Sequence, residues 1–166
     1  FCDGTWFAHL DVDHDLQVVG LGASASDVVL DGGLSGTGLT IDAGAQTVAV
    51  RNLTLTHGAA PSGNGGGIAC SDSSSSTRLV LQGVDVLGNH AANGGGIYAD
   101  GCDLTLDDVQ IADNEAENGG ALVLLDAPLA AKDVEVYDNT ATTEVAGFLL
   151  SGDTYAFDEV HFDGNA

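Results

Sequence analysis

The stretch LVLQGVDVLGNHAANGGGIYA, residues 79–99, decides the fold, because its pattern returns along the chain. Later copies read LTLDDVQIADNEAENGGALVL from Leu104, LAAKDVEVYDNTATTEVAGFLL from Leu129 and YAFDEVHFDGNA from Tyr155. Equivalent valines follow one another at intervals of 25, 25 and 26 residues, at Val84, Val109, Val134 and Val160. A repeat of this length indicates a solenoid, in which each copy forms one coil.

The segment between the repeated valine strands distinguishes two possible kinds of solenoid. Strings such as LQGVDVLGNHA also fit the spacing of leucine-rich repeats, whose return segment is helical. Here the return segment carries glycine pairs and triplets, which disfavour helix, and VEVYDN alternates with the period of a strand. The sequence therefore predicts an all-β chain, a right-handed parallel β-helix of about six coils of about 25 residues, with a leucine-rich solenoid as the alternative.

We expect the whole chain, residues 1–166, to form one β-helix domain. Residues 1–47 contain short β-branched runs separated by glycine and are predicted to form an N-terminal coil, and regular repeats occupy residues 48–166. A serine-rich insert at residues 71–76 is expected to be a solvent-exposed turn. Because the chain begins with Phe and contains no Met, we expect it to be a segment of a longer or processed protein.

Residues at equivalent repeat positions should stack, because parallel strands of successive coils lie about 4.8 Å apart. The four valines would form one aliphatic ladder inside the coil, and Ile68, Ile97 and Leu122 would form another. An asparagine also recurs at one position, where its amide can bond backbone groups of its own and the neighbouring coil. We predict a structural asparagine ladder of Asn89, Asn114, Asn139 and Asn165.

Glycines recur where the backbone must turn with positive φ, or where it passes too close to the next coil for a Cβ atom. The residues EVAGF, at 144–148, replace this glycine run in one copy, so that coil is expected to be locally reshaped. The predicted turn glycines are Gly65, Gly66, Gly94, Gly95, Gly119 and Gly120.

Charge excludes some partners. The chain has 25 acidic against 3 basic residues, a formal net charge of −22, so phosphate backbones and anionic lipids should be repelled. No run of about 18 apolar residues occurs, and we expect no membrane insertion. A weak Ca²⁺ candidate is the D-x-D-x-D pattern of Asp11, Asp13 and Asp15, which lacks the glycine and terminal Glu of an EF-hand. No other metal or cofactor is predicted.

The repeat motifs resemble those of a known family. The segments GGGI, GGGI and GGAL, with VLGN, IADN, VYDN and FDGN, resemble the GGA[ILV] and FxxN repeats of polymorphic outer-membrane-protein passenger domains. They are also similar to other right-handed parallel β-helix proteins on bacterial surfaces. The resemblance implies a bacterial cell-surface or secreted location, and it implies the fold more strongly than any activity.

The same architecture includes pectin-degrading enzymes, but no catalytic set stands out here. Lyases of that kind use Arg or Lys beside Ca²⁺, and the chain offers Arg51, Arg78 and Lys132 alone. Glycoside hydrolysis needs two carboxylates across a groove, yet Asp is so abundant that no pair is distinguished. The five histidines fall at different repeat phases and are interpreted as surface residues. We predict no catalytic residues.

Three cysteines remain. Cys70 and Cys102 follow equivalent glycine segments on neighbouring coils, so we predict a disulfide between them, with free buried thiols as the alternative. A disulfide would indicate an oxidising, extracytoplasmic compartment. The partner of Cys2 stays open.

Three classes of function are compatible with these features. The first is a non-catalytic extracellular domain, a stalk or adhesin-like passenger whose partners are flanking parts of the same protein, other copies or glycans. The second is a self-assembling subunit of a filament stacked end to end, since an uncapped β-helix exposes strand edges. The third is a polysaccharide-active enzyme.

Overall fold

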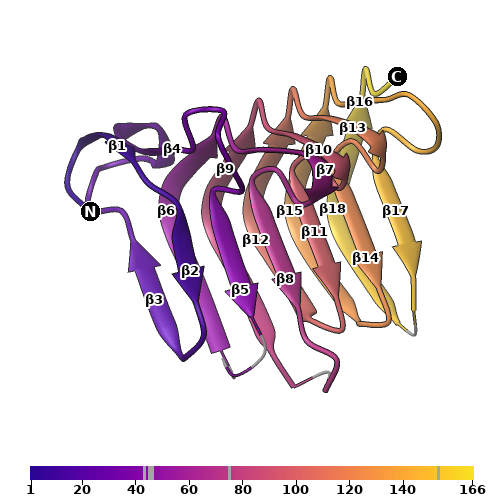
Figure 1. Cartoon of the computed structure of the whole chain (residues 1–166), viewed down its shortest axis with the longest axis horizontal. Helices are drawn as coiled ribbons and strands as arrows, with labels where there is room; N and C mark the ends of the chain where they lie inside the picture. Colours follow the sequence, from indigo (N-terminus) through magenta and orange to yellow (C-terminus); the bar gives the residue numbers. More distant parts are fainter. Residues whose placement is uncertain (43, 45–46, 75, 153) are drawn as a thin grey trace.

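The computed structural model describes residues 1–42, 44, 47–74, 76–152 and 154–166. The chain is an all-β parallel solenoid of about 6 turns of roughly 26 residues. Strands of successive coils lie side by side from the N-terminal to the C-terminal end, and the two termini lie at opposite ends (Figure 1). The predicted parallel β-helix is confirmed, and the leucine-rich alternative is wrong because the return segments are strands.

The strands form three parallel sheets. The first sheet, with eight strands, contains β1 (Gly4–Phe7), β4 (Val28–Asp31), β6 (Thr47–Thr56), β9 (Arg78–Leu87), β12 (Asp103–Ala112), β15 (Leu129–Tyr137) and β18 (Tyr155–Asp163) in this order, with β3 (Leu16–Val19) also on β6. The second sheet contains β17 (Phe148–Ser151), β14 (Leu122–Leu125), β11 (Ile97–Asp100), β8 (Ile68–Ser71), β5 (Leu39–Asp42) and β2 (Leu10–Val12). The third sheet contains β16 (Thr140–Ala141), β13 (Glu115–Asn118), β10 (His90–Asn93) and β7 (Ala59–Asn64).

The core consists of ladders of equivalent apolar side chains. In the first sheet Val109 pairs in register with Val84 on one side and Val134 on the other, and Val134 pairs with Val160. In the second sheet Ile97 pairs with Ile68 and Leu122. Apart from Val160, which is partly buried, these side chains are almost fully buried. Burial of such ladders is the main source of stability in this fold.

Each long strand of the first sheet bends at one residue with positive φ, which the pairing register skips in β12 and β15. The bend is occupied by Asn52, Gly83, Asp108, Asp133 and Glu159, with φ between 51° and 59°. Asn and Asp tolerate this left-handed conformation better than other side chains. Across the described residues, five aspartates have positive φ: Asp108, Asp113, Asp126, Asp133 and Asp138. Some of the many acidic residues therefore occupy corners of the coil where the backbone needs a positive φ.

The two glycines of each recurrent pair have different roles. The first has positive φ, with values of 64°, 63° and 61° at Gly65, Gly94 and Gly119. The second lies against the next coil. A Cβ atom on Gly66, Gly95 or Gly120 would lie 2.5 Å from the carbonyl oxygen of Gly95, Glu115 or Thr140, respectively.

The ends of the chain depart from the regular coil. Residues 1–47 contribute both β2 and β5 to the second sheet, so they span parts of two coils rather than the one that was predicted. The same region holds a 3₁₀ helix, η1 (Ala25–Asp27). Near the other end, β16 has two residues and residues 142–147 lie outside the strands, where the EVAGF segment replaces the glycine run. Within the described residues no helix is long and apolar enough to span a membrane.

Candidate functional site

A hollow of about 370 Å³ lies on the outer face of the first sheet, beside the bend of its strands. Asp85, Gln110, Glu135 and His161 stack in register there, one from each of β9, β12, β15 and β18. They point outward because the apolar residues on either side of each of them point toward the core side of the sheet. The bend residues Asp108, Asp133 and Glu159 border the same hollow. We call this set of seven residues the acidic groove.

Asp85 has the most distinctive environment in the acidic groove. Burial raises the pKa of its carboxyl, and the nearby charge of Asp108 raises it further. The Thr54 hydroxyl, 3.4 Å from Asp85 Oδ2, acts in the opposite direction. One coil further on, the Gln110 amide donates to Glu135 at 3.4 Å. The carboxyl groups and the Gln110 amide that line the hollow can form hydrogen bonds with hydroxyl groups of a ligand.

Lys132, one of the three basic residues, lies among carboxylates. Lys132 pairs with Asp107 and Asp158 across the sheet, and its Nζ lies 3.2 Å from Asp133 Oδ2. The hydrogen bond that Lys132 donates to Asp133, with the charges of Asp133 and Asp107, raises the pKa of Lys132. A lysine whose proton is stabilised in this way is a poor base.

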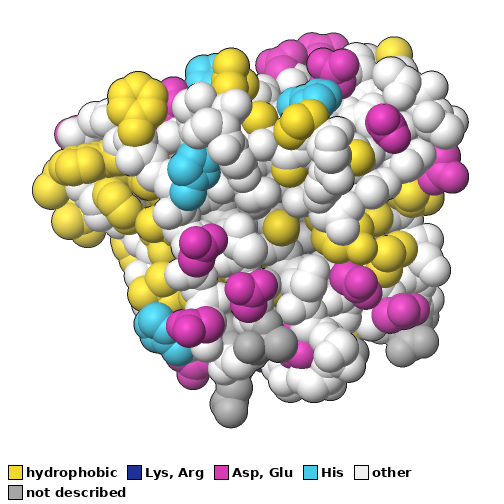
Figure 2. Space-filling view, in the orientation of Figure 1, with side chains coloured by type: hydrophobic (Ala, Val, Ile, Leu, Met, Phe, Trp, Pro, Cys, Tyr) yellow, Lys and Arg dark blue, Asp and Glu magenta, His cyan; other side chains and the backbone are white. Residues whose placement is uncertain are grey.

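The three aspartates of the D-x-D-x-D pattern do not come together. Asp11 lies in β2, which ends at Val12, so the pattern does not continue as one strand. Asp13 contacts His14 at 2.7 Å, and Asp15 accepts a hydrogen bond from the Thr47 backbone. Across the described residues no group of three or more His, Cys, Asp or Glu side chains is arranged to hold a metal ion. The acidic side chains on the face formed by the second sheet are scattered rather than gathered (Figure 2).

The repeated asparagines form a continuous buried ladder. Nδ2 of Asn89, Asn114 and Asn139 donates to Oδ1 of the asparagine one coil further on, at 3.0, 2.9 and 2.9 Å. Each of these oxygens also accepts the backbone N–H of the preceding asparagine, at 3.0 to 3.1 Å. The ladder continues to Gly58, whose N–H donates to Asn89 Oδ1 at 2.8 Å. At 1%, 0% and 0% exposure, Asn89, Asn114 and Asn139 are sealed from water.

A second amide ladder was missed by the sequence reasoning. Nδ2 of Asn93 donates to Oδ1 of Asn64, and Nδ2 of Asn118 donates to Oδ1 of Asn93, each at 2.8 Å. The signal was present, because an asparagine directly precedes each of the three glycine runs. This ladder lies near the surface, in contrast to the buried one.

Cys70 and Cys102 form a disulfide on the buried side of neighbouring coils, and Cys2 is an exposed free cysteine. The serine-rich insert beside the disulfide folds around Asp72, which is 1% exposed. The Asp72 carboxylate accepts hydrogen bonds from the backbone N–H and the hydroxyl of Ser74, Ser76 and Thr77, at 2.6 to 3.1 Å. Hydrogen bonds from Ser74 are the main cause of a strongly lowered pKa of Asp72. Ser75 lies outside the described residues.

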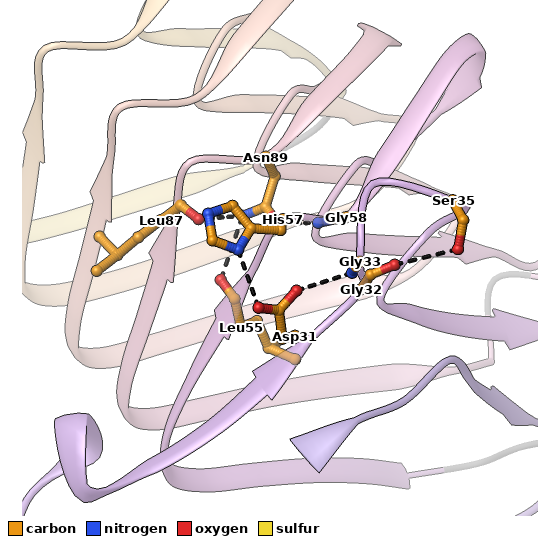
Figure 3. Close-up of polar contacts among 9 residues, drawn as sticks. All are labelled: Asp31, Gly32, Gly33, Ser35, Leu55, His57, Gly58, Leu87 and Asn89. Atoms are coloured by element: carbon orange, nitrogen blue, oxygen red, sulfur yellow. Dashed lines mark hydrogen bonds and ion pairs between the residues drawn. The ribbon is translucent and has the colours of Figure 1, made fainter. Parts of the chain in front are cut away.

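Two histidines near the N-terminal end have polar partners. Asp31 lies between the His57 ring, 3.0 Å away, and the Gly33 N–H (Figure 3). The same view shows the nearby Asn89, whose amide points toward the carbonyls of Leu55 and Leu87. His9 lies 3.1 Å from Ser35 Oγ, with its Nδ1 2.8 Å from the Thr37 carbonyl. Ser35 and His9 are both exposed.

Comparisons with protein-family models, curated proteins and solved structures found no match to this chain. The assignment as a parallel β-solenoid therefore rests on its own strand pairing.

Proposed function

We propose that this chain is a non-catalytic extracellular β-helix domain, a rigid stalk or adhesin-like passenger of a bacterial surface or secreted protein. The observation that carries the proposal is the buried asparagine ladder. It joins coil to coil through side-chain and backbone hydrogen bonds. A structure of this kind keeps a fixed length and displays its outer faces.

Location outside the cytoplasm is supported by the disulfide, because such bonds persist in oxidising compartments. The GGA[ILV]-like and FxxN-like segments support the finer proposal, that the chain resembles polymorphic outer-membrane-protein passengers. In the fold these segments become the glycine corners and the asparagine ladder. The resemblance therefore has a physical basis in coil geometry.

The acidic groove is the face we propose for glycan contact. Its carboxylates and the Gln110 amide offer hydrogen-bond partners to sugar hydroxyls along several coils. The negative charge favours neutral or basic glycans over polyuronates, which it would repel. Contact of this kind needs no catalytic residue.

A panel of polysaccharides tests the proposal. The chain is incubated with neutral, basic and acidic polymers, and binding is measured together with release of reducing ends and of unsaturated products. We expect binding without product, and E135Q should weaken binding while Q82A, on the neighbouring outer column, should not. Product formation that is lost in D85N would overturn the proposal and favour the polysaccharide-active enzyme.

A further inference from the structure

Each asparagine of the surface ladder is directly followed by glycine, which gives three pairs: Asn64–Gly65, Asn93–Gly94 and Asn118–Gly119. Such a pair can modify itself, because glycine has no Cβ atom to keep its backbone nitrogen away from the asparagine side chain. The glycine nitrogen bonds to Cγ of the asparagine as the Cγ–Nδ2 bond breaks, and Nδ2 leaves as ammonia with the proton of the glycine N–H. Water then opens the cyclic imide to aspartate or isoaspartate.

The glycine nitrogens of the first two pairs are held by the next coil. Gly65 N–H donates to the Asn93 carbonyl, and Gly94 N–H donates to the Asn118 carbonyl, each at 2.9 Å. A nitrogen held in this way must give up its hydrogen bond before it can turn toward the side chain of its own asparagine. The fold therefore slows the reaction at Asn64 and Asn93.

The third pair lacks this restraint. One repeat further on, the residue equivalent to Asn118 is Thr143, in the segment that lies outside the strands. The N–H groups of Thr143 and Glu144 both donate to the Glu117 carbonyl, at 2.9 and 3.4 Å, so the backbone turns here. Among the described residues no carbonyl accepts the Gly119 N–H. The irregular coil thus leaves the nitrogen beside Asn118 unbound.

The side chains of the surface ladder are also held unequally. Asn93 is bound at both ends, since its Nδ2 donates to Asn64 Oδ1 and its Oδ1 accepts from Asn118 Nδ2, each at 2.8 Å. Asn64 and Asn118 stand at the two ends of the ladder. Across the part of the chain that the structure describes, each of them makes one of these side-chain bonds.

We propose that Asn118 is a self-modification site, which the folded chain converts to aspartate or isoaspartate faster than Asn64 or Asn93. It combines a side chain bound at one end with a glycine nitrogen that the next coil does not hold. The asparagines of the buried ladder do not compete, because His, Glu and Thr follow Asn89, Asn114 and Asn139.

The modification would weaken the surface ladder one residue at a time. The carboxylate that replaces the Asn118 amide has no N–H to donate, so it faces Asn93 Oδ1 as a second acceptor and their hydrogen bond is lost. Asn93 is then bound only to Asn64. We therefore expect Asn93 to react faster in chains in which Asn118 has already reacted.

Peptide mapping by mass spectrometry tests the proposal. The folded chain is incubated at mildly alkaline pH, where the glycine nitrogen loses its proton more readily, and peptic peptides are sampled over time. Asn118 should react at least about fivefold faster than Asn93, because each of two hydrogen bonds that it lacks changes the rate about two- to tenfold. Asn64 should fall between them. Dividing each rate by that of the chain unfolded in urea removes the effect of neighbouring residues.

The variant N118S tests the ladder separately. It removes the donor to Asn93 Oδ1 but keeps the backbone carbonyl that accepts Gly94 N–H. The rate at Asn93 should rise about two- to tenfold. Q82A, which removes an amide bonded to Asp107 on the first sheet, is the matched control and should leave that rate unchanged.

Circular dichroism checks that both variants are folded. A corrected rate at Asn118 no higher than that at Asn93 would overturn the proposal. So would an unchanged rate at Asn93 in N118S, because the ladder would then offer no protection.

Discussion

The side-chain amide of Asn114 donates to Oδ1 of Asn139 at 2.9 Å and to the Val86 carbonyl of the preceding coil at 2.9 Å. One buried side chain therefore ties three successive coils together. Equivalent bonds at Asn89 and Asn139 repeat this arrangement. A buried amide with all its partners in place is costly to remove, because each partner left without a bond keeps its full desolvation cost.

Replacement of Asn114 by alanine should lower the free energy of unfolding by about 3 kcal/mol or more. The change leaves the Asn89 amide and backbone N–H without their acceptor. Urea unfolding followed by circular dichroism measures the effect. Asn93→Ala is the matched control from the surface ladder and should cost less than about 1 kcal/mol. Equal losses of unfolding free energy in the two variants would show that burial of the ladder does not determine how much it stabilises the fold.

Replacement of Gly95 by alanine should destabilise the chain by about 2 kcal/mol or more, because the new Cβ meets backbone oxygen atoms of the next coil. The control is Gly88→Asp. Gly88 has positive φ, unlike Gly95. The nearest neighbour of a Cβ atom there would be Thr56 Oγ1 at 3.7 Å, and Asp occupies the same corner at Asp113 and Asp138. We expect that control to change stability by less than about 1 kcal/mol. Thermal unfolding of both variants distinguishes a glycine needed for close contact with the next coil from a glycine that only provides positive φ.

Loss of the disulfide should cost about 3–4 kcal/mol, the entropy expected for a loop closed over a separation of 32 residues. The measurement is urea unfolding of C70A/C102A beside the oxidised chain. Cys2→Ser is the control and should leave the midpoint unchanged, since Cys2 is exposed and free. A double variant as stable as the parent would mean that the serine-rich insert is held by Asp72 alone.

The Asp72 carboxylate should make the folding stability of the chain depend on pH in the acidic range. Its folded pKa lies well below the unfolded value of about 3.9. The stability it contributes is therefore fully present above that unfolded value and is lost as pH falls through the folded pKa. Melting temperatures measured from pH 7 downward should place D72N below the parent at neutral pH, with the difference narrowing only below about pH 4. A constant difference at every pH would contradict this assignment.

Asp85 should behave in the opposite sense, because burial raises its pKa in the folded chain. A raised pKa gives a contribution that is present below the unfolded value and is lost as pH rises through the folded pKa. D85N removes the partly buried charge, so it should melt at a higher temperature than the parent at neutral pH and at the same temperature near pH 3. A lower melting temperature for D85N at neutral pH would show that the Thr54 contact outweighs the desolvation of Asp85.

The periodic part of the fold could be predicted from the sequence. Val84, Val109, Val134 and Val160 recur at a nearly constant interval, and in a parallel solenoid a constant interval becomes vertical stacking. The same logic placed the cysteines together, since Cys70 and Cys102 follow equivalent glycine runs. In the repeated coils each strand pairs with the equivalent strand of the next coil, so the interval between repeats is enough to predict which residues lie side by side.

Features that depend on local backbone conformation were not predictable in the same way. The positive φ of Asp108 and Asp133 follows from the bend of each long strand, which the alternation of LAAKDVEV does not reveal. The Asp72 network depends on a loop that folds back on one carboxylate, and serine composition alone indicated only an exposed turn. The acidic groove depends on which of many aspartates share a face beside that bend, and their abundance concealed it.

Hydrogen exchange of the ladder itself tests the central claim most directly, that buried asparagines join the coils into one rigid body. NMR can follow the side-chain NH₂ groups of Asn89, Asn114 and Asn139 together with their backbone N–H groups. The account predicts that all of them exchange with the free energy of global unfolding, while the surface amides of Asn93 and Asn118 exchange much faster. Fast exchange at Asn114, or coils that open one at a time, would contradict it.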